Sequence, residues 1–514
     1  MLSIKPRDYQ ESIFQTAKDN NTLVVLPTGV GKTLIALLLT IERQKKFPGQ
    51  KALILAPTKP LIEQHFNSFK KQLPELFAQL ELFTGATPAL QRKKLWNNAD
   101  IIFSTPQCIA NDIEKYLYDL KEVSLLVIDE AHRCLKNYSY TKVAKRYRQE
   151  SFHPRILGLT ASPGSDSDKV NQICAHLDIE KIESRTRESK DVKPYLQTLD
   201  FEKHFVPFPK EFIEIRTLLN NIYQNKIKQL REKNILFGPA NKITLLKLQS
   251  RLALQAGKGN GASMYGMSLT AQAIKISHAL ELLETQTLSG LQTYLNKLVK
   301  EAEQKKSKGV QTLVNSKEFQ ASLLSLNNLL KKQIEHPKVE ELNVLVEQDL
   351  QNKNAKIIIF TQFRDTTLVI NNKLKQISSA KPTIFVGQAK KKNPSGSTGL
   401  SQKEQKQIIQ DFRDSKTNIL IATSIGEEGL DIPEVSAVYF YEPIPSAIRK
   451  IQRAGRTARL SPGKLTILIT KNTRDETYHY ASVARERKMY KVIDKVKSDL
   501  KKPKTLNEQL SLFE

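Results

Sequence analysis

The 514-residue sequence predicts an α/β protein with two doubly wound parallel-sheet domains and an inserted all-helical domain. Two regions of the chain alternate short, continuous apolar runs with helix-length segments, which is typical of strands buried between two layers of helices. Between these regions, apolar residues recur at the spacing of a helix face. Polar and charged motifs begin where the apolar runs end, as ligand-binding loops do at the carboxyl edge of a parallel sheet.

The apolar runs give the expected strands in chain order. In the first region, residues 1–200, they cover residues 22–26, 52–56, 101–104, 125–128 and 156–159. In the second region, residues 341–485, they cover residues 356–360, 383–386, 418–422, 437–440 and 465–469. Each region is therefore expected to form one parallel sheet covered by helices on both faces.

The intervening residues 201–340 are expected to form a helical, basic insert. Leu280, Leu283, Leu291, Leu295 and Leu298 recur at three- and four-residue spacing, or multiples of it. Segment 226–258 holds eight basic residues and one acid. A solvated helix surface is the simplest interpretation of an isolated charge run, but insertion between two α/β domains favours a surface that binds a polyanion. Residues 486–514 are expected to form a basic helix and a C-terminal tail.

Composition limits the cellular setting and the partners. Lys and Arg total 80 against 53 Asp and Glu, a net charge of +27, which favours a polyanionic partner through counterion release. The charge by itself does not separate DNA, RNA and anionic membranes. Cys108, Cys134 and Cys174 form no CxxC pair, so neither a disulfide framework nor a zinc site is expected. With no signal segment or apolar span, we expect a cytoplasmic protein without a membrane partner.

The clearest motif is a glycine-rich loop between an expected strand and an expected helix. Its residues are Pro27, Thr28, Gly29, Val30, Gly31, Lys32 and Thr33. Such a loop wraps backbone N–H groups around phosphates, and the helix dipole adds a favourable field. Lys32 would reach the β- and γ-phosphates, and the Thr33 hydroxyl would hold Mg²⁺. The sequence therefore predicts ATP and Mg²⁺ as cofactors.

A second motif, Asp-Glu-Ala-His, follows the expected strand 125–128. Asp129 at the end of a strand can hold Mg²⁺, and the adjacent Glu130 can orient or deprotonate the attacking water. Alone this tetrapeptide is a weak signal, but together with the phosphate loop about a hundred residues earlier it is a strong one.

A third motif in the second region supplies Arg453, Arg456 and Arg459 at three-residue spacing, so that a helix would project them from one face. An arginine stabilises charge that develops on a transferred γ-phosphoryl group. ATP is therefore expected between the two α/β domains, and hydrolysis would open and close that cleft. A DNA-facing basic helix is the alternative role for Arg453.

The order of these motifs resembles that of superfamily 2 helicases. The first region adds segments 7–10, 56–60, 105–107 and 159–164, and the second adds 360–364, 385–388 and 422–431. More narrowly, FVGQ, ATSIGEEGLDIPEV and FYEPIPSAIRKIQRAGRTAR are similar to the archaeal Hef helicases, whose eukaryotic relatives are the Fanconi anaemia M-type fork translocases. The resemblance implies two RecA-like domains and a thumb-like insert that grips duplex arms. It also implies an ATP-dependent helicase or translocase with 3′-to-5′ polarity on forked and Holliday-type DNA, in fork repair and recombination.

The resemblance also assigns roles that the residues alone leave open. Arg7 and Gln10 would read adenine. Further nucleotide contacts would come from Gly429, Asp431 and Arg453, and catalysis would involve Gln452 with Arg456 and Arg459. Thr160 and Ser162 would couple the ATP site to the DNA site. The DNA backbone would be contacted by Thr58, Lys59, Thr105, Gly387, Gln388 and Thr423.

The C-terminal residues raise two further expectations. Gln509, Leu510, Leu512 and Phe513 match a peptide that binds sliding clamps; a disordered end or a last turn packed on the motor is the alternative. Glu486, Arg487 and Lys488 fit part of a nuclease motif, but Val492 stands where that motif needs Asp. No nuclease activity is therefore expected, and a separate nuclease acting in trans is left open.

Two rival functions are weighed against a DNA motor. A double-stranded RNA-dependent ATPase or translocase of the innate-immune sensor type is the first, although those sensors carry a zinc-binding domain after the motor. A branched-DNA-binding scaffold without catalysis is the second. The filled phosphate and arginine positions argue against the scaffold.

Overall fold

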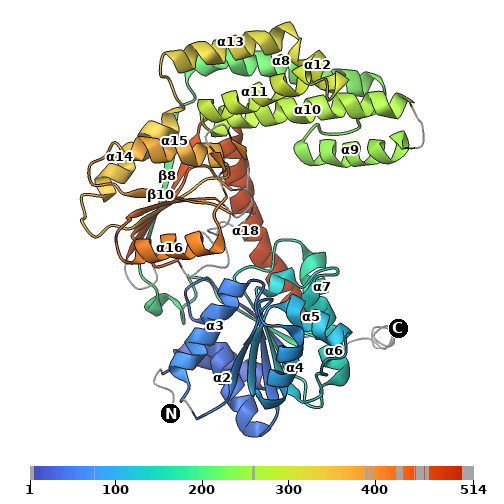
Figure 1. Cartoon of the computed structure of the whole chain (residues 1–514), viewed down its shortest axis with the longest axis vertical. Helices are drawn as coiled ribbons and strands as arrows, with labels where there is room; N and C mark the ends of the chain where they lie inside the picture. The colour runs from blue at the N-terminus through green and yellow to red at the C-terminus, as the bar shows by residue number, and fades with distance from the viewer. Residues whose placement is uncertain are drawn as a thin grey trace.

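The computed structural model describes residues 5–74, 76–257, 261–387, 392–393, 396–397, 399–423, 432–444, 446, 457 and 462–500 (Figure 1). Two parallel sheets with their helices form domain 1 and domain 2, and a bundle of helices, the insert, lies beyond domain 2 at the far end from domain 1. The expected fold class is confirmed.

Domain 1 is built on a seven-stranded parallel sheet with the order β3-β4-β2-β5-β6-β1-β7. Its strands are β1 (Thr22–Val25), β2 (Lys51–Leu55), β3 (Leu80–Phe83), β4 (Ile101–Ser104), β5 (Val123–Asp129), β6 (Ile156–Thr160) and β7 (Lys181–Ser184). Its helices are α1 (Asp8–Asp19), α2 (Lys32–Lys46), α3 (Lys59–Gln72), α4 (Ala89–Asn98), α5 (Pro106–Glu114), α6 (Ser139–Glu150) and α7 (Ser167–His176). All five expected strands are present. Sequence reasoning missed β3 and β7, the edge strands, because half-exposed edge strands lack a continuous apolar run.

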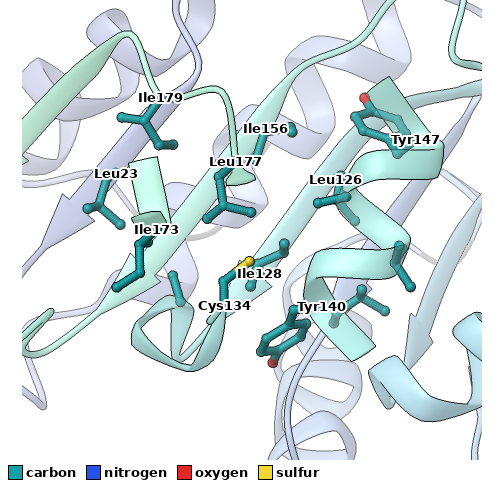
Figure 2. Packing of buried hydrophobic residues seen from close by; sticks show 14 of the residues in the cluster. Leu23, Leu126, Ile128, Cys134, Tyr140, Tyr147, Ile156, Ile173, Leu177 and Ile179 are labelled. Atoms are coloured by element: carbon teal, nitrogen blue, oxygen red, sulfur yellow. The ribbon is translucent and has the colours of Figure 1, made fainter. Parts of the chain in front are cut away.

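The two faces of this sheet bury alternate residues of each strand. Leu126 and Ile128 of β5 face α6 and α7, where Tyr140, Tyr147 and Ile173 complete the cluster (Figure 2). Leu125 and Val127 face the opposite layer, which includes α1 and α2. Cys108, Cys134 and Cys174 are buried and free, and burial raises the pKa of the Cys134 and Cys174 thiols to about 12. Such thiols pack as small apolar groups rather than react.

Domain 2 contains a six-stranded parallel sheet with the order β10-β13-β9-β14-β15-β8. Its strands are β8 (Leu199–Val206), β9 (Ile357–Phe360), β10 (Pro382–Phe385), β13 (Ile419–Ala422), β14 (Ala437–Phe440) and β15 (Gly463–Thr470), and its helices include α14 (Pro337–Asp349), α15 (Arg364–Leu374) and α16 (Gln402–Arg413). A short antiparallel pair, β11 (Lys392–Asn393) and β12 (Gly396–Ser397), lies between β10 and α16 in the chain. The five strands expected here are all present.

Strand β8 corrects the expected boundaries. It precedes the insert in the chain, yet it pairs along its whole length with β15, from Leu199 opposite Gly463 to Val206 opposite Thr470. The boundary expected at residue 201 therefore cuts through a strand of domain 2. The sequence hid this strand because it lies at the edge of the sheet and most of its residues are exposed. The boundary expected at residue 485 likewise cuts through one continuous helix, α18 (Arg474–Asp499).

The insert consists of helices packed around a leucine-rich core. They are α8 (Ile213–Glu232), α9 (Lys242–Ala256), α10 (Gly261–Thr285), α11 (Leu288–Glu303), α12 (Lys308–Val314) and α13 (Lys317–Lys331). The leucines expected on one helix face, Leu280, Leu283, Leu291, Leu295 and Leu298, are all buried in this core. Their periodicity therefore identified the packed faces of α10 and α11 correctly.

A buried ion pair fixes the insert to domain 2. The Lys338 Nζ donates to Asp475 Oδ2 at 2.8 Å and to the carbonyl oxygen of Thr285, the last residue of α10, at 2.7 Å. Asp475 also accepts from the backbone N–H of Thr470 at the end of β15. Both charged side chains are fully buried. Close by, Thr366 of α15 donates to Gln286 at 2.8 Å. The insert and domain 2 are thus held together as one body.

Helix α18 connects this body to domain 1 (Figure 1). It begins beside the Lys338–Asp475 pair and runs for 26 residues, about 39 Å at the rise of an α-helix. Near its end, Met489, Ile493 and Val496 are buried in the core of domain 1, in the same cluster as Ile173 of α7. The helix therefore carries buried residues at both of its ends.

Replacing Lys338 by Met would leave the Asp475 carboxylate buried without its charged partner. We expect the free energy of unfolding to fall by about 3–5 kcal/mol, the usual cost of removing one half of a buried ion pair. The double change Lys338→Met with Asp475→Leu should recover part of that loss, because no charge then remains buried. Chemical denaturation followed by circular dichroism measures both. Lys373→Met, which breaks the more exposed pair with Glu340, is the control and should cost about 0–1 kcal/mol; an equal loss in Lys338→Met would contradict the prediction.

Candidate ATP site and nucleic-acid interface

The phosphate loop lies between β1 and α2, as the sequence predicted. Gly29 and Gly31 adopt positive φ angles of 83° and 78°, a conformation that favours glycine. An added Cβ on Gly31 would also overlap the Nε2 atom of Gln10. Glycine at position 31 is therefore required twice, by the backbone and by the neighbouring side chain.

The two residues expected to read adenine approach this loop from α1. Gln10 Nε2 donates to the carbonyl oxygens of Val30 and Gly31, each at 3.3 Å. Tyr9 donates to the Val30 carbonyl at 2.7 Å, and Arg7 donates to the Tyr9 hydroxyl at 3.3 Å. Gln10 thus contacts the loop directly, and Arg7 reaches it through Tyr9. The adenine contacts of both residues stay predictions.

Lys32 lies at the first turn of α2. Its Nζ donates to the carbonyl oxygens of Leu26 at 3.0 Å and Pro27 at 3.3 Å. The two carbonyl oxygens therefore hold the ammonium group at the loop, and a bound phosphate would compete with them for its N–H donors.

Asp129 ends β5 as a buried carboxylate with a fixed orientation. Its Oδ1 accepts from the Glu130 backbone N–H at 3.0 Å, and its Oδ2 lies 2.8 Å from His65 Nε2. Burial alone would raise the pKa of Asp129, but the His65 hydrogen bond and the positive charge of Lys32 hold that pKa below its usual value. The group is therefore ionised and available as a ligand.

The chemistry of the donor set fits Mg²⁺. The Thr33 hydroxyl and the Asp129 carboxylate are hard oxygen ligands, and Mg²⁺ is commonly held by one or two protein oxygens together with nucleotide phosphates. Within the described ranges, no group of three or more His, Cys, Asp or Glu side chains is placed to hold a metal ion by itself. Thr33 and Asp129 would thus hold the ion together with bound nucleotide.

A chain of polar contacts leads from Glu130 to Thr160. Glu130 has a positive φ of 51°, and its carboxylate lies 3.2 Å from His132 Nδ1. The same nitrogen lies 3.1 Å from the hydroxyl of Thr160, whose carbonyl oxygen accepts from Leu26 N–H at the start of the phosphate loop. Sequence reasoning missed His132 as part of this chain, although it is the last letter of the Asp-Glu-Ala-His motif.

The predicted coupling residues connect this chain to α18. The Ser162 N–H donates to the Thr160 hydroxyl at 3.1 Å, and the Ser162 hydroxyl donates to the sulfur of Met489 at 2.7 Å. Both Ser162 and Met489 are buried. The involvement of Met489 carried no signal in the sequence, because the two residues are 327 positions apart.

The described residues expected to contact DNA lie at the carboxyl ends of strands. Thr58 and Thr105 are the N-cap residues of α3 and α5, after β2 and β4, and Gly387 and Thr423 follow β10 and β13. In domain 1 this is the edge that also carries the phosphate loop and Asp129. Across the gap between domains, Lys406 of α16 pairs with Glu63 of α3 at 3.2 Å, and Lys59 pairs with the same carboxylate at 3.7 Å.

Some expected site residues lie outside the described residues. They are Gln388, Gly429, Asp431, Gln452, Arg453, Arg456, Arg459 and the tail residues Gln509, Leu510, Leu512 and Phe513. Thr457, next to Arg456, is described: it is buried and donates to the Val435 carbonyl of domain 2 at 2.7 Å. The roles of the arginines stay predictions.

Comparison with known proteins places the chain in a family. The family described as DEAD/DEAH box helicase matches residues 7–170, the helicase conserved C-terminal domain matches residues 337–461, and the family described as "Putative ATP-dependent RNA helicase, helical bundle" matches residues 211–334. The crystal structure of the Pyrococcus furiosus Hef helicase domain is similar with a TM-score of 0.70 and 41% identity, over 93% of this chain and 98% of that one. The chain belongs to the Hef-type superfamily 2 helicases.

Two curated relatives of this Hef-type chain differ in the nucleic acid that they are named for. A "Putative ATP-dependent RNA helicase" of Methanocaldococcus jannaschii is 37% identical over 96% of this chain and 61% of its own length. An "ATP-dependent DNA helicase" of Neurospora crassa is 34% identical over 92% of this chain and 42% of its own length. The chain thus spans less than two thirds of these relatives. Among the described residues, no helix is long and apolar enough to cross a bilayer.

Replacing Gly31 by Ala should weaken the binding of Mg²⁺-ATP by about tenfold or more, because the methyl group must displace Gln10 and strain the loop. Gly49→Ala is a matched control: Gly49 has a similar φ of 80° but open space around its Cβ position. Titration with a fluorescent ATP analogue measures both variants. Equal affinity losses in the two would show that the effect is a general one of substituting a positive-φ glycine and not specific to the phosphate loop.

Proposed function

We propose that this Hef-type chain is an ATP-dependent DNA helicase or translocase for forked and Holliday-type DNA, with 3′-to-5′ polarity, in fork repair and recombination. The observation that carries the proposal is the fixed connection between the basic insert and domain 2 through buried Lys338, which pairs with Asp475 and donates to the Thr285 carbonyl at the end of α10. A DNA-gripping arm that moves rigidly with one motor domain can convert cleft closure into movement along a duplex arm.

In the proposed mechanism, Lys32 would bind the β- and γ-phosphates, and Thr33 and Asp129 would hold Mg²⁺. Bound Mg²⁺ neutralises charge on the phosphates. Glu130 would orient the attacking water, and its carboxylate lies 3.2 Å from His132 Nδ1. Arg456 and Arg459 would complete the site from domain 2, with Gln452 beside them. Closure of domain 2 onto domain 1 is thereby tied to the hydrolysis step.

The insert supplies the proposed surface for a duplex arm. Lys228, Arg231, Lys233, Lys247 and Arg251 of α8, α9 and the turn between them are exposed. Few acids offset them in this part of the insert: Glu232 is the one acidic residue in segment 226–258. Such a surface binds phosphates without reading base sequence, which suits recognition of a branch by its shape.

Two alternatives compete with this proposal. The first is an ATPase or translocase that acts on double-stranded RNA, since one relative is named as an RNA helicase and another as a DNA helicase. A scaffold without catalysis is the other, but the ordered contacts of Lys32 and Asp129 argue for a working ATP site. Binding of the C-terminal tail to a sliding clamp, cooperation with a nuclease in trans and nucleoid association are further proposals. The absence of nuclease activity stays a prediction.

Forked DNA should stimulate ATP hydrolysis more than linear duplex, single strand or double-stranded RNA. Lys32→Ala should lower kcat by at least about 100-fold on every substrate, because the transition-state charge loses its cation. Steady-state phosphate release measures this comparison. Stimulation by RNA alone would favour the RNA alternative, and no hydrolysis on any substrate would favour the scaffold.

Removing two insert charges, Lys247→Gln with Arg251→Gln, should weaken binding to forked DNA and flatten its salt dependence. The slope of log affinity against log salt should decrease by about 0.9 for each phosphate contact that is lost. Lys121→Gln with Lys169→Gln in domain 1 removes the same charge from exposed positions as a control. Fluorescence anisotropy at several salt concentrations measures both variants, and equal slopes in the two would place the duplex arm elsewhere.

A further inference from the structure

Helix α3 contacts three parts of the machinery within two turns. Its N-terminus carries Thr58 and Lys59, the expected contacts with the DNA backbone. One turn later, Glu63 pairs with Lys406 of domain 2 at 3.2 Å. Half a turn further, His65 Nε2 lies 2.8 Å from Oδ2 of Asp129, the expected Mg²⁺ ligand. The DNA contact and the metal contact are thus on one rigid element, about 10 Å apart along its axis.

His65 is a buried residue that makes a polar contact with Asp129. The residue is only 6% exposed, and its Nδ1 is buried without a hydrogen-bond partner among the described residues. Burying an unsatisfied nitrogen is unfavourable, and an apolar residue of similar size would avoid that cost. What histidine adds at this position is the hydrogen bond to Asp129.

That hydrogen bond completes the orientation of the carboxylate. Oδ1 of Asp129 accepts from the Glu130 N–H, and Oδ2 is held by His65, so each oxygen has one partner from the protein. A carboxylate oxygen with one such partner keeps a lone pair for a metal ion. Groups that orient a metal ligand in this way control the affinity of the site. A displacement of α3 would turn the carboxylate, because His65 joins that carboxylate to the helix.

We propose that His65 is a positioning residue that couples nucleic-acid binding to Mg²⁺-nucleotide binding through α3. DNA bound at Thr58 and Lys59 fixes the helix, and His65 then holds Asp129 in the orientation that Mg²⁺ requires. The inference rests on the proposed function, since it takes the DNA contacts of Thr58 and Lys59 from it. Coupling between binding sites is reciprocal, so bound Mg²⁺-nucleotide must change DNA affinity through the same contact.

The test measures a ratio of DNA affinities. Binding of the full chain to a fluorescent fork is titrated with a saturating non-hydrolysable ATP analogue and Mg²⁺, and again without nucleotide. Wild-type protein should show a change of about 5-fold or more, the usual size of such coupling. His65→Phe fills the site without an N–H group and should bring the ratio close to one. His65→Gln keeps a donor of similar reach and should retain most of the coupling.

Each ratio compares two DNA affinities of the same variant, with and without nucleotide. A loss of DNA affinity that is equal in both states therefore leaves the ratio unchanged. Phe69→Leu on the same helix perturbs the packing of α3 but not Asp129, and it should keep the wild-type ratio. A wild-type ratio in His65→Phe would overturn the inference, and so would an equal loss of coupling in Phe69→Leu. Either result would leave the proposed function intact if forked DNA still stimulates ATP hydrolysis by wild-type protein. A failure of that stimulation would instead count against the proposed function.

Discussion

The buried pair between Lys338 and Asp475 is the constraint on which the arrangement of the domains depends. Two opposite charges with no exposure are tolerated because each compensates the other, and here their hydrogen bonds join three elements. Lys338 holds the last carbonyl of α10, and Asp475 holds the end of β15. The insert, domain 2 and the start of α18 therefore meet at this pair. Separating them is strongly unfavourable, because it would expose one charge or leave it without its partner.

The protein therefore consists of two bodies rather than three: domain 1, and domain 2 together with the insert. The insert follows domain 2, and domain 1 is joined to that body by α18 and by the surface pair between Glu63 and Lys406. The apolar end of α18 lies against Ser162, which is hydrogen-bonded to Thr160 and thereby to the phosphate loop. A change at the ATP site thus has a continuous packed route to the helix that starts beside the insert.

In domain 1, the residues of the ATP-site motifs are held in place by side chains that contact them. The glycine loop, Lys32 and Asp129 follow from local sequence, but their geometry is set by side chains from elsewhere. Gln10 fills the space beside Gly31, and His65 holds Asp129. Each partner comes from a different element, so a change in α1 or α3 reaches the nucleotide without touching the motif itself.

The sequence by itself determined the fold class, the central strands and the phosphate-binding chemistry, because these depend on local apolar runs and on contiguous motifs. It also identified the packed faces of α10 and α11, because the apolar residues on one face of a helix recur at three- and four-residue spacing. Only the tertiary structure decided that β8 belongs to domain 2, that α18 enters the core of domain 1, and that His65 and Met489 contact Asp129 and Ser162. These features pair residues far apart in the chain. An edge strand or a buried histidine has no periodic signal that names its partner, so such contacts are fixed only when the whole chain packs.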